Sequence, residues 1–157
     1  MSAHARLKEL GITLPAVVPP VAAYIPAVRT GNLVFTSGQL PMVDGELPAQ
    51  GKVGALVTPE TAKELARTCA LNALAAIDAL VGLDSVVKVV KVVGFVASAP
   101  DFSGQPGVVN GASELLGEVF EGEAGRHARS AVGVASLPLD APVEVELVVE
   151  LDPSAVS

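Results

Sequence analysis

Residues 58–96 read TPETAKELARTCALNALAAIDALVGLDSVVKVVKVVGFV, and this stretch decides the fold. Its first part predicts a long helix, because Thr58 can cap the first turn, Pro59 suits the first helical position and apolar residues recur at spacings of three and four. Gly82 ends that helix. The Val-rich residues 86–96 then predict a long strand, which we expect to be central and covered on both faces. A long helix followed at once by a long strand indicates an α/β domain.

The segments on either side of this stretch complete a mixed sheet. Thr30-Gly31-Asn32 lie between two runs rich in β-branched and aromatic residues and predict a hairpin turn. The further elements that we expect are strands at residues 24–29, 33–39 and 52–56, a helix at 108–120, and strands at 128–136 and 143–151. The fold class is therefore α/β, in the α+β sense of a mixed sheet, with both long helices on one face. We expect the opposite face to be buried by self-association.

Length and composition limit the classes of function. The 157 residues fit one domain, with residues 1–20 as a proline-containing arm of weak helical character and residues 21–157 as the folded part. No apolar run reaches the roughly 18 residues that span a bilayer, and the charged N-terminus is unlike a signal peptide. We therefore expect a cytoplasmic protein that binds no membrane. A formal net charge of −7 disfavours nucleic acid as a partner.

The sequence offers no motif for a metal ion or a cofactor. Cys69 is the only cysteine, and it falls in the apolar stripe of the first long helix, which is typical of an inert core thiol. His4 and His127 are too few to complete a zinc site, and no glycine motif for nucleotide phosphates is present. Ser37 lacks the surroundings of a nucleophilic serine. We expect neither a metal nor a cofactor.

Arg129 and Glu144 are the two residues with an arguable chemical role. Arg129 opens an expected inner strand, where a buried guanidinium needs an anionic partner. That partner is either a ligand or one of the chain's own glutamates, and spacing alone leaves both open. Glu144 shares a strand face with Glu146 and Glu150, and a row of carboxylates is usually a solvated face.

Several segments taken together resemble the Rid family, the YjgF-like reactive-intermediate deaminases also known as endoribonuclease L-PSP proteins. They are Tyr24, residues 31–41 (GNLVFTSGQLP), 89–92 (VVKV), Asp101-Phe102, Asn110, 128–132 (ARSAV), Leu137-Pro138 and 143–146 (VEVE). The resemblance covers most of the chain after residue 20. The chain departs from the usual family pattern at His127, Ala131 and Gly133, which indicates a divergent subgroup with an altered pocket wall.

The resemblance implies a homotrimer with a chorismate-mutase-like fold and three equivalent clefts between subunits. In the deaminase branch, the arginine that matches Arg129 clamps the carboxylate of a 2-imino or enamine acid, and water hydrolyses the C=N bond to give a 2-oxo acid and ammonia. The glutamate that matches Glu144 is the family's candidate for activating that water. The residues that would line the cleft together with Arg129 are Tyr24, Ser37, Gly38, Asn110 and Ala131.

Two functions from different classes follow from this resemblance. The first is cofactor-independent hydrolysis of small 2-imino or enamine acids, with Arg129 and Glu144 as catalytic residues. The alternative is a non-catalytic trimer that binds small carboxylates, which the altered positions Ala131 and Gly133 favour. Ribonuclease activity, which the older family name suggests, ranks last, because neither histidine lies near a basic cluster and the acidic charge opposes RNA.

Overall fold

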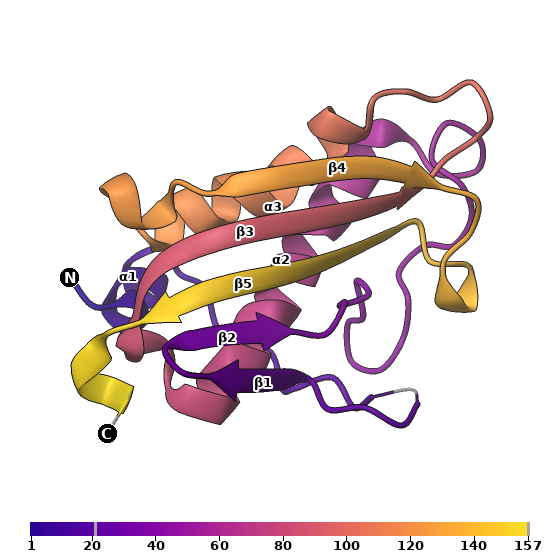
Figure 1. The fold of residues 1–157 in the computed structure, drawn as a ribbon. Coiled ribbons are helices and arrows are strands. Elements are labelled where there is room, and N and C mark those ends of the chain that lie inside the picture. The colour runs from indigo at the N-terminus through magenta and orange to yellow at the C-terminus, as the bar shows by residue number, and fades with distance from the viewer. Residues whose placement is uncertain (21, 157) are drawn as a thin grey trace.

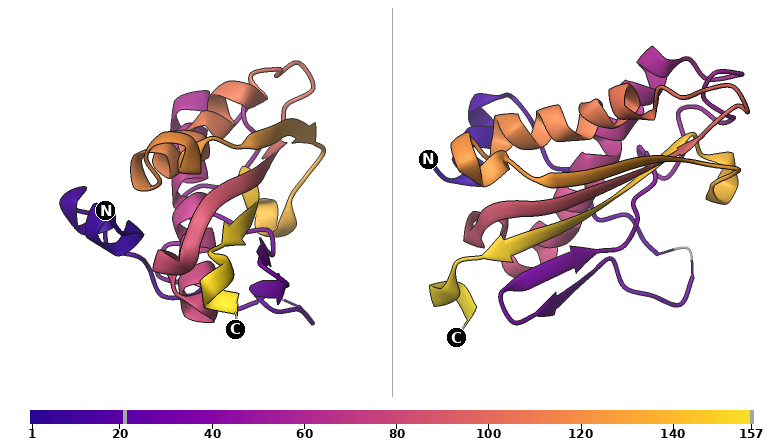
Figure 2. Two further views of the ribbon diagram at one scale, coloured as in Figure 1. Left: turned by 60° about the vertical axis from the view of Figure 1, so that its left-hand side comes forward. Right: turned by 45° about the horizontal axis from the view of Figure 1, so that its top comes forward.

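A five-stranded sheet with two long helices on one face forms the body of the protein (Figure 1). The computed structural model describes residues 1–20 and 22–156. The helices are α1 (Ala3–Glu9), α2 (Pro59–Val81) and α3 (Gln105–Val119), and the strands are β1 (Ala27–Thr30), β2 (Leu33–Thr36), β3 (Val86–Ala97), β4 (Ala128–Val134) and β5 (Val143–Leu151). The strand order is β1-β2-β5-β3-β4, with β3 and β4 parallel and the other neighbours antiparallel. Both views in Figure 2 show α2 and α3 on the same side of the sheet, as the sequence predicts.

Helix α2 begins and ends at the residues that the sequence indicates. The Thr58 hydroxyl oxygen accepts a hydrogen bond from the amide of Thr61, and Gly82 takes a φ of 79° directly after the last turn. The apolar stripe faces the sheet, with Cys69 fully buried in it. Burial raises the pKa of the Cys69 thiol, so the thiolate that would be needed for reactivity is disfavoured. The prediction of a core thiol is confirmed.

Three expectations about the sheet are wrong. The strand expected to be central, β3, lies between β5 and β4, and β5 takes the middle of the sheet. β4, which carries Arg129, is an edge strand of this chain and not an inner one. Residues 52–56 form no strand, since Val53 makes only isolated bridges. β3 is rich in valine on both faces. Its residues on one face are buried under the helices, and those on the opposite face are partly covered.

Helices α2 and α3 are in close contact at Gly111. A Cβ atom at this position would overlap the carbonyl oxygen of Lys63. We expect Gly111→Ala to force the helices apart and to lower the free energy of unfolding by about 1–3 kcal/mol, measured by urea denaturation. Gly117→Ala is the matched control, because an added Cβ at that position of α3 meets no atom within 4 Å. Alanine favours a helix over glycine, so the control should be neutral or stabilising, and equal losses in both variants would contradict this contact.

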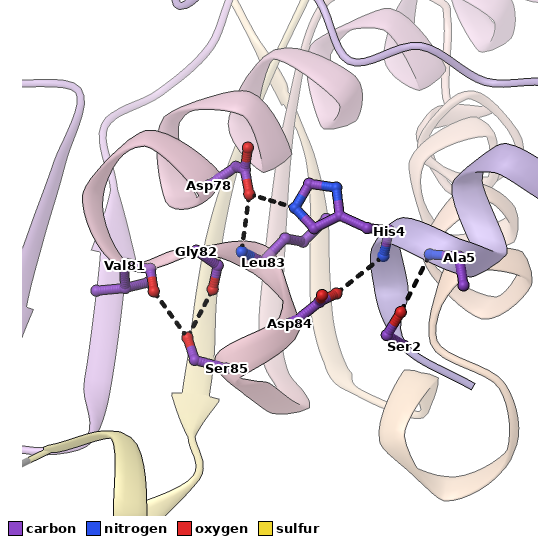
Figure 3. Close-up of polar contacts among 9 residues, drawn as sticks. All are labelled: Ser2, His4, Ala5, Asp78, Val81, Gly82, Leu83, Asp84 and Ser85. Carbon is purple, nitrogen blue, oxygen red and sulfur yellow. Dashed lines mark hydrogen bonds and ion pairs between the residues drawn. The ribbon is translucent and has the colours of Figure 1, made fainter.

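The N-terminal segment folds back onto the domain. Leu7 is buried in the core, and His4 ties α1 to the end of α2 (Figure 3). The Nε2 atom of His4 lies 2.7 Å from Asp78 Oδ1, and its backbone amide donates to Asp84 Oδ1 at 2.9 Å. Residues 12–20 continue without helix or strand. The predicted arm is therefore a short helix and an extended segment, while its predicted boundary as a separate unit stays a prediction.

Among residues 1–20 and 22–156, no helix combines the length and the apolar composition that crossing a bilayer requires. The cytoplasmic location predicted from the sequence stays a prediction.

Candidate functional site

Arg129 lies at the start of β4 and bonds to α3. Its Nη1 donates to Asn110 Oδ1 at 2.7 Å and to Ser113 Oγ at 3.3 Å, and its Nη2 donates to the carbonyl oxygen of Pro106 at 3.3 Å. All three acceptors are uncharged. Within the described ranges no carboxylate pairs with Arg129, so the structural ion pair left open by the sequence is not formed there. The guanidinium is held in place while its charge stays available to an anion.

His127 extends the hydrogen-bond chain behind Arg129. Its Nδ1 lies 2.9 Å from the carbonyl oxygen of Gly125, which can only accept, so we assign the proton of the neutral ring to Nδ1. The Nε2 atom then accepts from the Ser113 hydroxyl at 2.9 Å, and the Ser113 oxygen is free to accept from Arg129. Ser113 is not among the residues that the sequence predicts for the site. Its spacing of three from Asn110 places both on one helix face, and that signal could have found it.

Glu144 leaves the sheet on the face opposite to Arg129. It alternates along β5 with fully buried valines, so its side chain points away from the helices. Arg129 pairs in register with Val92, which pairs with Leu147, and both of these are buried under the helices. Side chains of directly paired residues share a face. The two predicted catalytic residues of one chain are therefore on opposite faces, with β3 between their strands.

The carboxyl group of Glu144 packs over Gly38. A Cβ atom at position 38 would lie 2.7 Å from Glu144 Cδ, so glycine leaves the room that the carboxyl group occupies. Burial raises the pKa of Glu144, and the charge of Glu146 raises it further. A carboxylate of raised basicity is better suited to take a proton from water than an ordinary surface glutamate.

A cavity of about 670 Å³ opens beside Glu144. Residues 15–20 of the extended segment form one wall, and Tyr24, Gly38 and Met42 contribute to the others. No side chain that lines it is basic. The described part of the chain also contains no cluster of three metal-ligating side chains. The cavity therefore suits an apolar group better than a carboxylate.

The residues predicted to form the site fall into two groups. They are Tyr24, Gly38 and Glu144 beside the cavity, and Asn110, Arg129 and Ala131 at the edge formed by β4 and α3. Ser37 does not line the cavity, and its hydroxyl donates to the carbonyl oxygen of Ile25. Within one chain, the residues of each group lie close to one another, but the two groups lie apart.

Comparison with known proteins settles the family. The sequence model described as endoribonuclease L-PSP matches residues 15–151, which is most of the chain. The chain belongs to the endoribonuclease L-PSP family. This is the Rid family that the sequence motifs resemble, so the expected family is confirmed.

Two relatives and one crystal structure are similar to this chain over most of its length. Protein TCP17 of Trypanosoma cruzi is 46% identical over 149 residues, which are 94% of this chain and 93% of TCP17. The 2-iminobutanoate/2-iminopropanoate deaminase of Escherichia coli strain K12 is 34% identical over 134 residues, 85% of this chain and 89% of the deaminase. The crystal structure of Atu1372 from Agrobacterium tumefaciens, a protein of unknown function, is 47% identical with a TM-score of 0.87, covering 96% of this chain and 92% of its own. The structural likeness supports the mixed fold that the sequence predicts.

Proposed function

We propose that this Rid-family chain hydrolyses small 2-imino and enamine acids to 2-oxo acids and ammonia without a cofactor. The observation that carries the proposal is the state of Arg129, a guanidinium fixed by neutral acceptors with no carboxylate partner among the described residues. Such a group recognises a carboxylate through two parallel, charge-assisted hydrogen bonds. The 34% identity to a protein named as a 2-imino acid deaminase supports this choice of substrate.

The reaction needs one water and one group that moves protons. Arg129 binds the substrate carboxylate, and Glu144 accepts a proton from water as the water oxygen bonds to the imine carbon. The electron pair of the C=N bond moves to nitrogen, which takes up this proton and gives a carbinolamine. Glu144 then takes the proton of the new hydroxyl group and passes it to the nitrogen, so the C–N bond breaks, ammonia leaves and the C=O bond forms. An enamine first takes up a proton at carbon and gives up one at nitrogen to become the imine. The raised pKa of Glu144 favours its role in these transfers.

The site needs a second copy of the chain, because Arg129 and Glu144 of one copy lie on opposite faces of the sheet. The face that carries Glu144 also exposes apolar side chains, with Val28, Phe35 and Val132 each between 39% and 50% exposed. Burial of such a face favours self-association. We therefore propose a homotrimer in which Arg129 of one subunit and Glu144 of its neighbour complete each site.

Subunit mixing tests the shared site. Arg129→Ala and Glu144→Gln should each be inactive alone, and unfolding and refolding them together should restore up to about a quarter of wild-type ammonia release, because one interface in four combines both intact residues. Light scattering on a size-exclusion column should show a trimer. A mixture as inactive as the separate variants, or a stable monomer of 15.8 kDa, would exclude a site between subunits.

A non-catalytic carboxylate-binding protein is the alternative. The hydrogen-bonded group around Arg129 is complete within one chain, so it can hold a carboxylate even where no Glu144 lies near. Binding of a 2-oxo acid by calorimetry with no ammonia release from any 2-imino acid would favour this alternative over hydrolysis.

A further inference from the structure

We propose that the cavity beside Glu144 holds the side chain of the substrate, and that it selects 2-imino acids whose apolar side chain ends in an uncharged hydrogen-bond donor. A phenol or an indole has this character. The inference rests on the proposed function, because it takes the 2-imino acid from there and adds the identity of its side chain.

The size and lining of the cavity favour a large apolar group. Its volume of about 670 Å³ lies in the usual range of roughly 300–1,000 Å³ for small-molecule sites. A three-carbon acid would leave most of this space to water. The apolar wall comes from residues 15–20 together with Leu40, Met42 and Pro138. An apolar side chain placed there loses contact with water, which is favourable in proportion to the area covered.

Asn72, at the wall of the cavity, has a buried acceptor without a partner among the described residues. This residue of α2 lines the cavity and is only 1% exposed. Its Nδ2 donates to the carbonyl oxygens of Leu40 at 3.0 Å and Met42 at 3.1 Å, and these two acceptors fix which end of the amide is nitrogen. Its Oδ1 is buried and has no hydrogen bond among the described residues. A buried oxygen left in this state is costly, so a ligand donor would be favoured there once the cavity wall shifts to open this atom, which the structure shows closed to solvent.

The charged side chains at the cavity determine which end of the substrate enters it. The charged side chains that line the cavity are Asp44 and Glu144, both acidic. They repel a carboxylate, which is bound instead by Arg129 of the neighbouring copy in the proposed site. The imine carbon then lies near Glu144, at the cavity wall, and the side chain extends inward past residues 15–20. An uncharged donor reaches Asn72 without the large cost of burying an ammonium group.

Binding of three product-like 2-oxo acids measures this selection. We expect calorimetry to give phenylpyruvate an affinity about 10-fold or more above that of pyruvate, and 4-hydroxyphenylpyruvate about 10-fold above phenylpyruvate, which is the roughly 1.4 kcal/mol that one hydrogen bond to a buried oxygen can contribute. The hydroxyl comparison uses the wild-type protein, so it needs no change at Asn72. Equal affinities for all three acids, or failure of the aromatic acids to bind, would overturn the inference.

Two tryptophan variants of the extended segment test whether the preference for aromatic acids arises in this cavity. Val18→Trp fills part of the cavity and should cut the ratio of 4-hydroxyphenylpyruvate to pyruvate affinity by about 10-fold or more. Thr13→Trp is the control, because Thr13 lies on the same segment but outside this cavity, and its ratio should equal that of the wild type. Equal ratios in both variants would contradict the placement of the side chain.

Arg129→Ala separates a failure of this inference from a failure of the proposed function. It should weaken binding of all three acids, since all carry the same carboxylate. Aromatic selectivity that depends on Val18 but not on Arg129 would keep the cavity assignment and contradict the proposed clamp. Pyruvate binding that depends on Arg129, with no preference for aromatic acids, would keep the proposed function and overturn the inference.

Discussion

Glu144→Gln should lower turnover by roughly 10²-fold or more while leaving the fold, the subunit assembly and 2-oxo acid binding nearly intact. The amide keeps the shape that packs over Gly38 but cannot accept the proton of the attacking water. The measurement is ammonia release from freshly generated 2-aminoacrylate, followed through formation of the 2-oxo acid. Circular dichroism and light scattering on the same samples would show that structure and assembly persist.

Glu146→Gln and Glu150→Gln are the matched controls on the same strand, with rates compared at a pH above the acid limb of the pH profile. If Glu144 were one more surface carboxylate, all three variants would be nearly silent, since changes on an exposed face usually stay within about 0.5 kcal/mol. Equal rates in the wild type and the three variants would remove Glu144 from the mechanism and favour the binding protein.

The dependence of turnover on pH is a second test of the role of Glu144. Glu144 must be deprotonated to act as a base, and burial raises its pKa, so turnover should fall on acidification at a pH above that of an ordinary glutamate. The charge of Glu146 raises this pKa further, so Glu146→Gln should move the acid limb of the profile to lower pH. An acid limb that does not move would place the titrating group elsewhere.

Arg129→Lys should be nearly as damaging as Arg129→Ala, each lowering kcat/KM by roughly 10²-fold or more and weakening 2-oxo acid binding. The guanidinium donates to Asn110 through Nη1 and to Pro106 through Nη2, and its five N–H groups leave donors for a carboxylate. A lysine keeps the charge, but its single nitrogen cannot satisfy α3 and grip two carboxylate oxygens together.

Arg126→Lys is the matched control for this substitution. Arg126 lies three residues earlier, is exposed, and pairs with Glu123 at the surface, so its replacement should leave kinetics unchanged. Wild-type binding of 2-oxo acids by Arg129→Lys would show that the clamp assignment is wrong.

The sequence by itself determined the helices, the hairpin and the family. Thr58, Pro59 and Gly82 act within one helical turn of the residues they affect, so the limits of α2 follow from local chemistry. The turn at residues 30–32 is equally local, although the strands it joins are shorter than predicted. The segments that resemble the Rid family, among them the one around Arg129, together carried enough of the family pattern to identify it before any fold was known.

Only the tertiary structure decided how the candidate site is divided. The middle position of β5 and the edge position of β4 depend on pairing between residues far apart in sequence, which alternation within one strand does not specify. That pairing places Arg129 and Glu144 on opposite faces. Asn72 lies among the buried residues of α2, and its unpartnered oxygen appears only once Leu40 and Met42 take up its amide nitrogen. Residues 15–20 have no regular backbone pairing of their own, so their place as a cavity wall follows from the packing of the folded chain.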